Sequence, residues 1–424
     1  MSVSPLPLFG RLAAFAVALA LCLVGAPARA DENGFKIGEG RLHPFFALES
    51  RFDSAAAVVP KNQSVPNSSF EIAGDMLLRF KPGLRFELPG NNLQLNLAGN
   101  LDYVQYAGVI NPSTRVASRM QGEADLDIGI NRSGVISLDI GDHFVRSDRT
   151  VNTVLGVGAL SLFNDARAQV NIRPSGGALS FEPNYHLATE FFSPFSAVRP
   201  AGCASNNPQC DPTAVSRLNY MNHRFGLNAR WKFLPKTALV LDSSLGYRTY
   251  IAGGQGVPLL GMKAMAGLAG LLTQHISTTL KLGWGQDFTN NSYKSLIGTA
   301  EVAYLFSQTG QIRGGYVRTF EPVGGNFISY GDDRGYLDAR FFLGGRVTLR
   351  GYAAYDFLSF RGASNTGSAH NITGDVGGDY QFFPWLTTGV GYLFTNRSSA
   401  DGQSFLNLAN FQRHEIYARV HLVY

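Results

Sequence analysis

The chain has 424 residues, of which 16% are charged and 48 are glycine. Soluble globular proteins carry about 25% charged residues and about 7% glycine, so this composition favours lipid-facing strands and tight turns. The formal net charge of +5 is small and scattered along the chain, which argues against a nucleic-acid partner.

The first thirty residues predict a signal peptide. An apolar run at 12–24 follows Arg11, and Ala28 and Ala30 form a small-x-small cleavage pattern. We therefore expect cleavage after Ala30 and export of the mature protein. Cleavage leaves a formal charge of about +3, from 34 basic and 31 acidic residues. Cys22 follows a leucine instead of a small residue, which disfavours a lipoprotein.

After a short periplasmic segment at 31–40, residues 41–424 are predicted to form one all-β domain, because β-barrels often run long. Eighteen segments alternate apolar and polar residues at period two, so each strand has an apolar and a polar face. The predicted strands are 41–52, 70–88, 92–107, 116–131, 134–146, 158–173, 178–191, 217–233, 237–251, 259–272, 276–288, 292–307, 311–321, 334–344, 346–360, 370–383, 386–397 and 411–424.

Short and long connections alternate between these strands. The tight turns fall at 89–91, 132–133, 174–177, 234–236, 308–310, 344–345 and 384–385, and the longer loops at 53–69, 147–157, 192–216, 322–333, 361–369 and 398–410. Short turns on one rim and long loops on the other are typical of an antiparallel up-and-down barrel in the outer membrane. An open sheet of this size would leave exposed edges, which favours closure.

Two alternatives remain for the apolar segments. A soluble sandwich would produce the same alternation in any single strand, with its polar face turned to water. The stretch 257–272 contains Lys263 and is shorter than the ~20 residues of a membrane helix. We therefore expect strands, and not helices, to cross the membrane.

The last predicted strand places Val420, Leu422 and Tyr424 on its apolar face. An apolar strand face that stops on an aromatic resembles the closing strand of bacterial outer-membrane barrels. In those proteins the terminal aromatic is the signal read by the barrel assembly machinery. The resemblance implies that these three residues form the assembly signal here.

Aromatic residues gather near strand ends, mostly beside the tight turns. They predict an interfacial girdle at the lipid boundary, although Trp284 lies closer to the loop end and would belong to the other belt. The alternative is that these side chains pack in a core. The predicted girdle residues are Trp231, Phe233, Trp284, Phe382, Trp385 and Tyr424.

If the apolar faces meet lipid, the polar faces line the bore. The predicted lining residues are Arg119, Glu123, Asp125, Asp127, Arg167, Arg173, Tyr336, Asp338, Arg340, Arg346, Arg350, Tyr352, Asp356, Asp375, Asp379 and Arg419. Their mixed signs suit polar, hydrogen-bonding cargo better than one type of ion, and Tyr336 and Tyr352 offer faces on which sugars stack. The alternative is that these charges pair across strands and stiffen the wall.

Cys203 and Cys210 are the two cysteines of the mature chain. In an exported protein this pair predicts a disulfide, and the metal alternative lacks further ligands nearby. The loop 192–216 that holds them is the predicted candidate for a segment that folds inward and narrows the bore.

The sequence gives no catalytic motif, and we expect neither enzymatic activity, a cofactor nor a metal. No two of the eight histidines have metal-ligand spacing on a common element. His143, with Asp142 beside it, is the residue that a site on the barrel wall would use if the protein were an enzyme.

Several strand ends resemble a family of outer-membrane β-barrel porins. They are 245–250 (LGYRTY), 291–304 (NSYKSLIGTAEVAY), 311–320 (QIRGGYVRTF) and 334–340 (RGYLDAR). Members of that family are often associated with exopolysaccharide secretion, so the resemblance implies a conduit for polysaccharide. A passive conduit needs a separate periplasmic export protein as partner. A general or solute-specific porin for small hydrophilic molecules is the other hypothesis.

Overall fold

The computed structural model describes residues 34–60, 70–148, 159–174, 177–194, 212–251, 257–289, 294–307, 309–323, 328–362, 366–399 and 410–424. The predicted signal peptide and cleavage site therefore lie outside the described residues. Within them the strands are β1 (Phe35–Ile37), β2 (Gly40–Pro60), β3 (Phe70–Leu88), β4 (Leu93–Tyr106), β5 (Arg119–Ile130), β6 (Ile136–Ser147), β7 (Ala159–Ile172), β8 (Leu179–Pro194), β9 (Tyr220–Leu234), β10 (Thr237–Tyr250), β11 (Leu259–Leu271), β12 (Ile276–Asp287), β13 (Lys294–Ser307), β14 (Gly310–Pro322), β15 (Ser329–Leu343), β16 (Val347–Arg361), β17 (Thr366–Phe383), β18 (Leu386–Ser399) and β19 (Phe411–Val423). In the described part of the chain, the 3-10 helices η1 (Pro112–Ala117) and η4 (Pro212–Leu218) also lie between strands.

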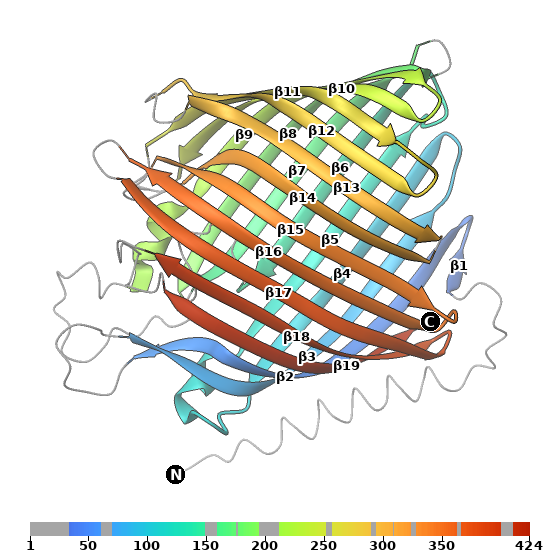
Figure 1. Ribbon diagram of the computed structural model, residues 1–424. Coiled ribbons are helices and arrows are strands. Elements are labelled where there is room, and N and C mark those ends of the chain that lie inside the picture. The colour runs from blue at the N-terminus through green and yellow to red at the C-terminus, as the bar shows by residue number, and fades with distance from the viewer. Residues whose placement is uncertain are drawn as a thin grey trace.

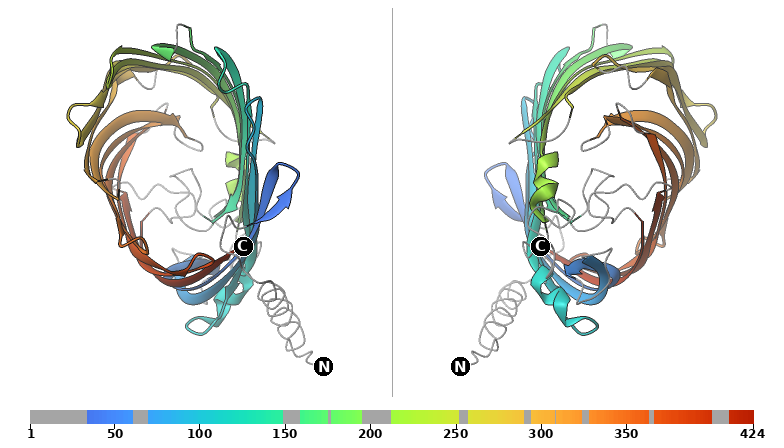
Figure 2. Two further views of the ribbon diagram at one scale, coloured as in Figure 1. Left: turned by 90° about the vertical axis from the view of Figure 1, so that its right-hand side faces the viewer. Right: turned by 90° about the vertical axis from the view of Figure 1, so that its left-hand side faces the viewer.

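Strands β2 to β19 form a closed barrel. Each strand pairs antiparallel with the next, as the tilted wall in Figure 1 shows, and β19 returns to pair with β2 from Glu415↔Asp53 to Val423↔Phe45. Figure 2 shows these strands as a ring when the molecule is turned by 90°. The predicted all-β barrel of eighteen antiparallel strands is therefore confirmed. The short strand β1 pairs with the start of β2 outside this count.

Alternation along each strand separates an apolar outer face from a polar inner one. On β4, Leu93, Leu97 and Leu101 are 47%, 47% and 59% exposed, whereas Asp102 and Tyr106 on the other face are 4% and 1% exposed. Large apolar side chains are exposed in the same way on strands around the whole barrel. Water-soluble monomers rarely expose a continuous apolar surface larger than a few hundred Å², so this face is suited to lipid.

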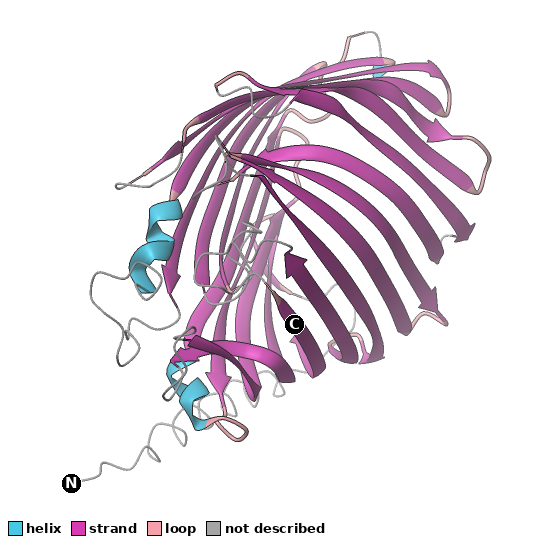
Figure 3. Cartoon of the chain, turned by 60° about the vertical axis from the view of Figure 1, so that its left-hand side comes forward, coloured by secondary structure: helices cyan, strands magenta, loops and turns pink. Residues whose placement is uncertain are grey.

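The two rims differ as the sequence predicts. Turns such as Gly344–Gly345, with φ of +56° and +71° that favour glycine, join strands at one rim. Longer connections lie at the other rim, which we call the outer rim, and Figure 3 shows η1 and η4 at that end. Among the described residues, no helix is long and apolar enough to cross a bilayer.

Buried apolar clusters lie at the outer ends of the strands. Val215 and Leu218 of η4 pack on Phe192 and Tyr220. Similar clusters join η1 to β2, β3 and β4, and β15 to β16 and β17. The apolar packing in the described residues is thus confined to local patches, and it leaves the inner wall between them polar.

Several strands run further toward the outer rim than predicted. The first strand extends to Pro60, and β15 begins at Ser329 instead of 334. These outer ends lack the lipid-facing alternation on which the prediction depended. Conversely, β9 begins at Tyr220 because 217–218 belong to η4. Arg346 was predicted on a strand and lies instead in the turn before β16, exposed at the tight-turn rim.

Candidate functional site

The seam that closes the barrel is lined by charged residues. Strand register sets Arg51 opposite Tyr417 and Glu49 opposite Arg419 on the inner face. Arg51 contacts Glu49 at 2.7 Å and Glu415 at 2.5 Å, and all three side chains are at most 10% exposed. One guanidinium therefore ties the first barrel strand to the last.

A second guanidinium, that of Arg413, neutralises an acidic pair on the neighbouring rung of the same two strands. Asp53 and Glu415 lie directly opposite each other, and Asp53 is fully buried. The Arg413 Nε donates to both Asp53 oxygens at 3.1 Å, and a terminal nitrogen lies 2.5 Å from Asp53 Oδ2. Arg413 also lies 3.5 Å from Asp148 and 3.6 Å from Glu415. Like charges opposite each other would repel without it.

The same pattern continues on the strands to either side. Arg79 of β3 donates to Asp102 of β4 at 3.3 Å, and it lies 3.6 Å from Glu49. Lys81 lies 3.6 Å from Asp102. Arg79 also donates to the side-chain carbonyl of Gln121 at 3.3 Å. Strands β2 to β5 are thereby linked along the inner wall.

On the other side of the seam, Asp379 of β17 receives two guanidinium groups. Arg350 approaches it to 2.7 Å and Arg419 to 2.8 Å. Arg350 also donates to the hydroxyl of Tyr417, whose buried ring has the guanidinium carbons of Arg51, Arg350 and Arg419 within 6.0 Å. Tyr417 is thus a cation–π platform at the centre of the seam.

These groups form what we call the paired belt. Seven of its members are cations and seven are carboxylates, so its formal charge is zero. They are Arg51, Arg79, Lys81, Arg119, Arg350, Arg413 and Arg419, with Glu49, Asp53, Asp102, Asp148, Asp375, Asp379 and Glu415. A balanced wall gives no strong preference for one sign of ion.

The paired belt borders a cavity of ≈580 Å³ on the inner wall, between the strands on both sides of the seam. Its lining includes Glu49, Arg79, Asp102, Gln121, Glu123 and Arg419. Volumes of this size hold small ligands, so polar groups of a passing molecule have room to reach the belt.

The opposite wall carries cations of a different kind. Arg230 and Lys232 of β9 are exposed, and they have no ion-pair partner in the described part of the chain. Their cross-strand neighbours on β10 are Val240 and Ala238. Lys281, by contrast, pairs with Asp242 at 2.6 Å. The bore therefore has a balanced wall and a wall with spare positive charge near the tight-turn rim.

At the outer rim the barrel wall separates between β13 and β14. Pairing of these strands ends at Gly298↔Arg318, although β13 continues to Lys294 and β14 stays paired with β15 to Pro322. The end of β14, residues 320–323, crosses onto the inner faces of β10 to β13, and we call it the inturned segment.

The buried side chain of Phe320 anchors the inturned segment. Its side chain is 1% exposed and packs against Ile297. Glycines make room for the ring, because a Cβ on Gly285 would lie 2.7 Å from it and one on Gly261 would lie 3.2 Å away. Lys263 lies 5.2 Å from the ring centre. Any side chain at Gly285 would displace the ring.

Polar contacts hold the rest of the inturned segment. Lys263 donates to Glu321 at 2.5 Å. Arg248 donates to the carbonyl of Pro322 at 2.9 Å, and the Tyr250 hydroxyl donates to the carbonyl of Val323. The segment therefore lies on the inner side of the wall near the outer rim, a position that the sequence prediction assigned only to the loop 192–216.

The loop 192–216 is described only at its two ends, where η4 packs on Phe192 inside the barrel. Cys203 and Cys210, and with them the predicted disulfide, lie outside the described residues. The aromatic residue Phe320 near the end of 311–321 is visible in the sequence, but it identifies no partner strand.

The other predicted lining residues take several different partners. Arg167 lies 3.9 Å from Asp127, Arg173 donates to the Arg132 carbonyl at 2.9 Å, and Asp338 lies 3.7 Å from Arg313. Tyr336 donates to Glu301, and Asp356 accepts from Arg334 and from Asn371. Arg340 borders a cavity near the tight-turn rim, and Tyr352 lies opposite Asp338 on β16.

In the turn before β6, Arg132 lies 2.7 Å from both Asp127 and Asp139. Partial burial lowers its pKa, but the hydrogen bonds and charges of the two carboxylates outweigh this effect and raise the pKa. Arg132 therefore stays charged and bridges the two carboxylates at the tight-turn rim.

Aromatic pairs mark both ends of the outer face. Near the tight turns, Trp231 lies 6.0 Å from Phe233, and Trp385 stacks on Phe383 at 5.2 Å. Tyr424 packs 4.8 Å from Phe35 of β1. Phe382 is exposed beside them, whereas Trp284 lies near the outer end of β12.

A second aromatic set lies toward the outer rim and was not predicted from the sequence. There a tyrosine hydroxyl meets a histidine Nδ1 on the next strand in three places: Tyr185 with His223 at 2.7 Å, Tyr355 with His370 at 2.6 Å, and Tyr392 with His414 at 2.7 Å. Paired Tyr and His side chains of this kind suit a membrane interface, where one end of each ring is wet.

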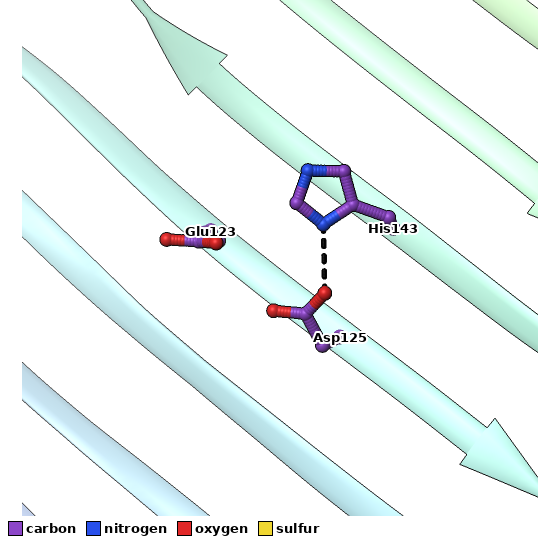
Figure 4. Close-up of side chains that lie close together, drawn as sticks. All are labelled: Glu123, Asp125 and His143. Carbon is purple, nitrogen blue, oxygen red and sulfur yellow. Dashed lines mark hydrogen bonds and ion pairs between the residues drawn. The ribbon is translucent and has the colours of Figure 1, made fainter. Parts of the chain in front are cut away.

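His143 does not form a site with Asp142, because adjacent strand residues point to opposite faces. Asp142 accepts from Asn164 at 2.9 Å. His143 instead contacts Asp125 across the β5–β6 pair at 2.7 Å, close to Glu123 (Figure 4).

No protein-family model matches the chain, and no curated protein matches it. Among solved structures, the siderophore receptor PirA from Pseudomonas aeruginosa is 10% identical, with 93% of this chain and 81% of that chain covered and a TM-score of 0.44. OccK3 (OpdO) from Pseudomonas aeruginosa is 12% identical, with coverages of 90% and 95% and a TM-score of 0.44. The FrpB iron transporter from Neisseria meningitidis is 10% identical, with coverages of 90% and 81% and a TM-score of 0.46. These likenesses are too weak to transfer a ligand or partner.

The chain's own geometry identifies its architecture. A closed antiparallel barrel with an apolar outer face and a polar inner wall is the architecture of outer-membrane β-barrel channels.

Proposed function

We propose that this protein is a passive channel of the bacterial outer membrane and that its cargo is polysaccharide leaving the cell. The observation that carries the proposal is the polar wall at the seam, where the charges of the paired belt balance, inside a closed barrel whose outer face is apolar. A barrel of sixteen to eighteen strands leaves room for an aqueous channel.

The chemistry of the inner wall supports an uncharged or weakly charged polar cargo. The paired belt is neutral, so it offers hydrogen-bond donors and acceptors without a strong field. Tyr336 and Tyr352 add aromatic hydroxyl groups between arginines and aspartates on β15 and β16. Sugars use both kinds of group, and the resemblance of several strand ends to exopolysaccharide-associated porins points to the same cargo.

A passive bore supplies no driving force, so polymer export needs a partner. We propose that a separate periplasmic polysaccharide-export protein docks at the tight-turn rim. The same proposal includes export by the signal peptide and recognition of Val420, Leu422 and Tyr424 by the barrel assembly machinery.

A second candidate function is a porin for small hydrophilic solutes. The observation that favours it is the inturned segment, which is seated by Phe320 and held by Lys263. A narrowed mouth limits the size of what passes, which suits small solutes better than a polymer.

Two experiments separate these functions. Deletion of the gene should remove or reduce surface polysaccharide if the protein exports it, and unchanged surface polymer would refute export. Purified protein in planar bilayers should then show whether the bore conducts. The solute porin would be established instead by two results together: deletion leaves the surface polymer unchanged, and the purified protein shows an open conductance that small sugars block.

A further inference from the structure

Three metal-ligating side chains meet on the inner wall at one point, outside the paired belt. Glu123 and Asp125 lie on one face of β5, and His143 lies opposite Asp125 on β6. One ligand atom from each lies within 4.8 Å of the other two. Figure 4 shows the two carboxylates and the imidazole ring gathered over the same pair of strands.

The charges at this point are not compensated as they are elsewhere. Every carboxylate of the paired belt has an arginine or lysine within 3.9 Å. Within the described residues, Glu123 has no ion-pair or hydrogen-bond partner, and the partner of Asp125 is His143. Two carboxylates on one strand face without a cation repel each other.

A further carboxylate adjoins the group on the other side. Strand register places two carboxylates directly opposite His143: Asp125 on β5 and Asp165 on β7. Asp165 itself contacts His186 of β8 at 3.2 Å. Carboxylate, imidazole, carboxylate and imidazole thus follow one another across four strands.

We propose that Glu123, Asp125 and His143 bind a divalent transition-metal ion of the zinc class on the wall of the bore. The imidazole nitrogen distinguishes such ions from Mg²⁺ and Ca²⁺, which prefer oxygen ligands. This inference goes beyond the proposed channel function and does not depend on the cargo.

The geometry suits such an ion. Zinc bonds to imidazole nitrogen and carboxylate oxygen are about 2.0–2.2 Å long, which places neighbouring ligand atoms of a tetrahedral site about 3.3–3.6 Å apart. The Nδ1 of His143 and Oδ1 of Asp125 are 2.7 Å apart in the structure, so the two side chains move apart by less than about 1 Å when an ion replaces the proton between them. Glu123 reaches the ion by rotation of its own side chain.

The ion would keep open positions toward the bore. The side chains of His143 and Asp125 are 42% and 51% exposed, and Glu123 borders the ≈580 Å³ cavity. Water or an anionic group of the cargo could complete the coordination sphere.

The test is zinc titration of the full-length mature protein in detergent, by isothermal titration calorimetry after chelator dialysis. Free thiols are alkylated first, so that cysteine does not contribute. We expect one saturable zinc site. His143→Gln and Glu123→Gln should each weaken binding roughly tenfold or more, since even ligand-supporting groups contribute 10–100-fold.

The matched control is His421→Gln. His421 also borders the cavity and has Phe45 as its ring neighbour, 5.7 Å away. We expect its zinc affinity to equal that of the wild type, and heat-modifiable gel mobility checks that each variant is folded. Absence of a saturable zinc site, or wild-type affinity in both folded His143→Gln and Glu123→Gln, would overturn the proposal.

Discussion

Replacing Arg413 with methionine should destabilise the barrel more than any other single change at the seam. Arg413 is the one cation of the described residues that contacts Asp53, through three contacts of 3.1, 3.1 and 2.5 Å. After the change, Asp53 would keep one donor, the backbone N–H of Ala55 at 2.9 Å. The fully buried carboxylate would then face Glu415 without a counter-charge.

The size of the effect follows from these contacts. Removing one partner of a buried ion pair costs about 3–5 kcal/mol. The other two carboxylates near Arg413 keep their own arginines, because Arg119 lies 2.7 Å from Asp148 and Arg51 lies 2.5 Å from Glu415. We therefore expect the loss to arise at Asp53 and to be about 4 kcal/mol.

Urea unfolding of the barrel refolded into lipid vesicles measures this loss. Adding Asp53→Asn to Arg413→Met removes the orphaned charge and should recover about 2–3 kcal/mol of the unfolding free energy. Arg167→Met serves as control, since Arg167 is 55% exposed and 3.9 Å from its carboxylate, and it should cost less than about 0.5 kcal/mol. A loss below about 1 kcal/mol for Arg413→Met would refute the reasoning.

Three further predictions concern the outer face, the mouth and a loop. Val376→Arg puts a charge on a 55% exposed outward position and should cost about 2–4 kcal/mol in lipid, whereas Thr373→Arg on the bore side of β17 should leave the unfolding free energy nearly unchanged. Phe320→Ala should cost about 3 kcal/mol and raise single-channel conductance, and an unchanged conductance would show that the inturned segment does not narrow the mouth. Asp75 accepts from the N–H groups of Gly108, Val109 and Ile110 at 2.6, 3.1 and 3.1 Å. Asp75→Ala should cost about 1–3 kcal/mol and make residues 107–118 sensitive to limited proteolysis, while equal cleavage of both proteins would contradict the anchoring role.

Alternation and turn length were sufficient to predict the barrel. Each predicted strand overlaps an observed one, because facing lipid on one side imposes the period-two pattern on every strand. The pattern also selected Arg350, Asp379 and Arg419 as residues of the polar face, where the structure brings them together.

The partners of these residues could not be predicted in the same way. Asp53 and Arg413 are 360 positions apart in the sequence, and the predicted first strand stopped one residue before Asp53. In each strand, the residues that alternate with the apolar face point into the bore. Applied to β2, β3, β4 and β19, this alternation would also have selected Glu49, Arg51, Arg79, Asp102 and Glu415.

The same limit explains the inturned segment and the candidate metal site. The residues of 311–321 do not indicate that Phe320 packs against β11 and β12, the strands that contain Gly261 and Gly285. Likewise, His143 and Asp125 lie side by side because strand register pairs them. The spacing of ligand residues in a sequence indicates only metal sites that are built on a single strand or helix.

The lock between the earliest and latest strands of the barrel also restricts the order of folding. Contacts between residues this far apart in the sequence form slowly, and until β19 pairs with β2, Asp53 has neither Arg413 nor the strand that covers it. A partly folded sheet would carry this carboxylate hydrated at its free edge, where its charge resists pairing with another chain. Asp53 would thus help to protect the unfinished barrel from aggregation until Arg413 of the last strand neutralises it.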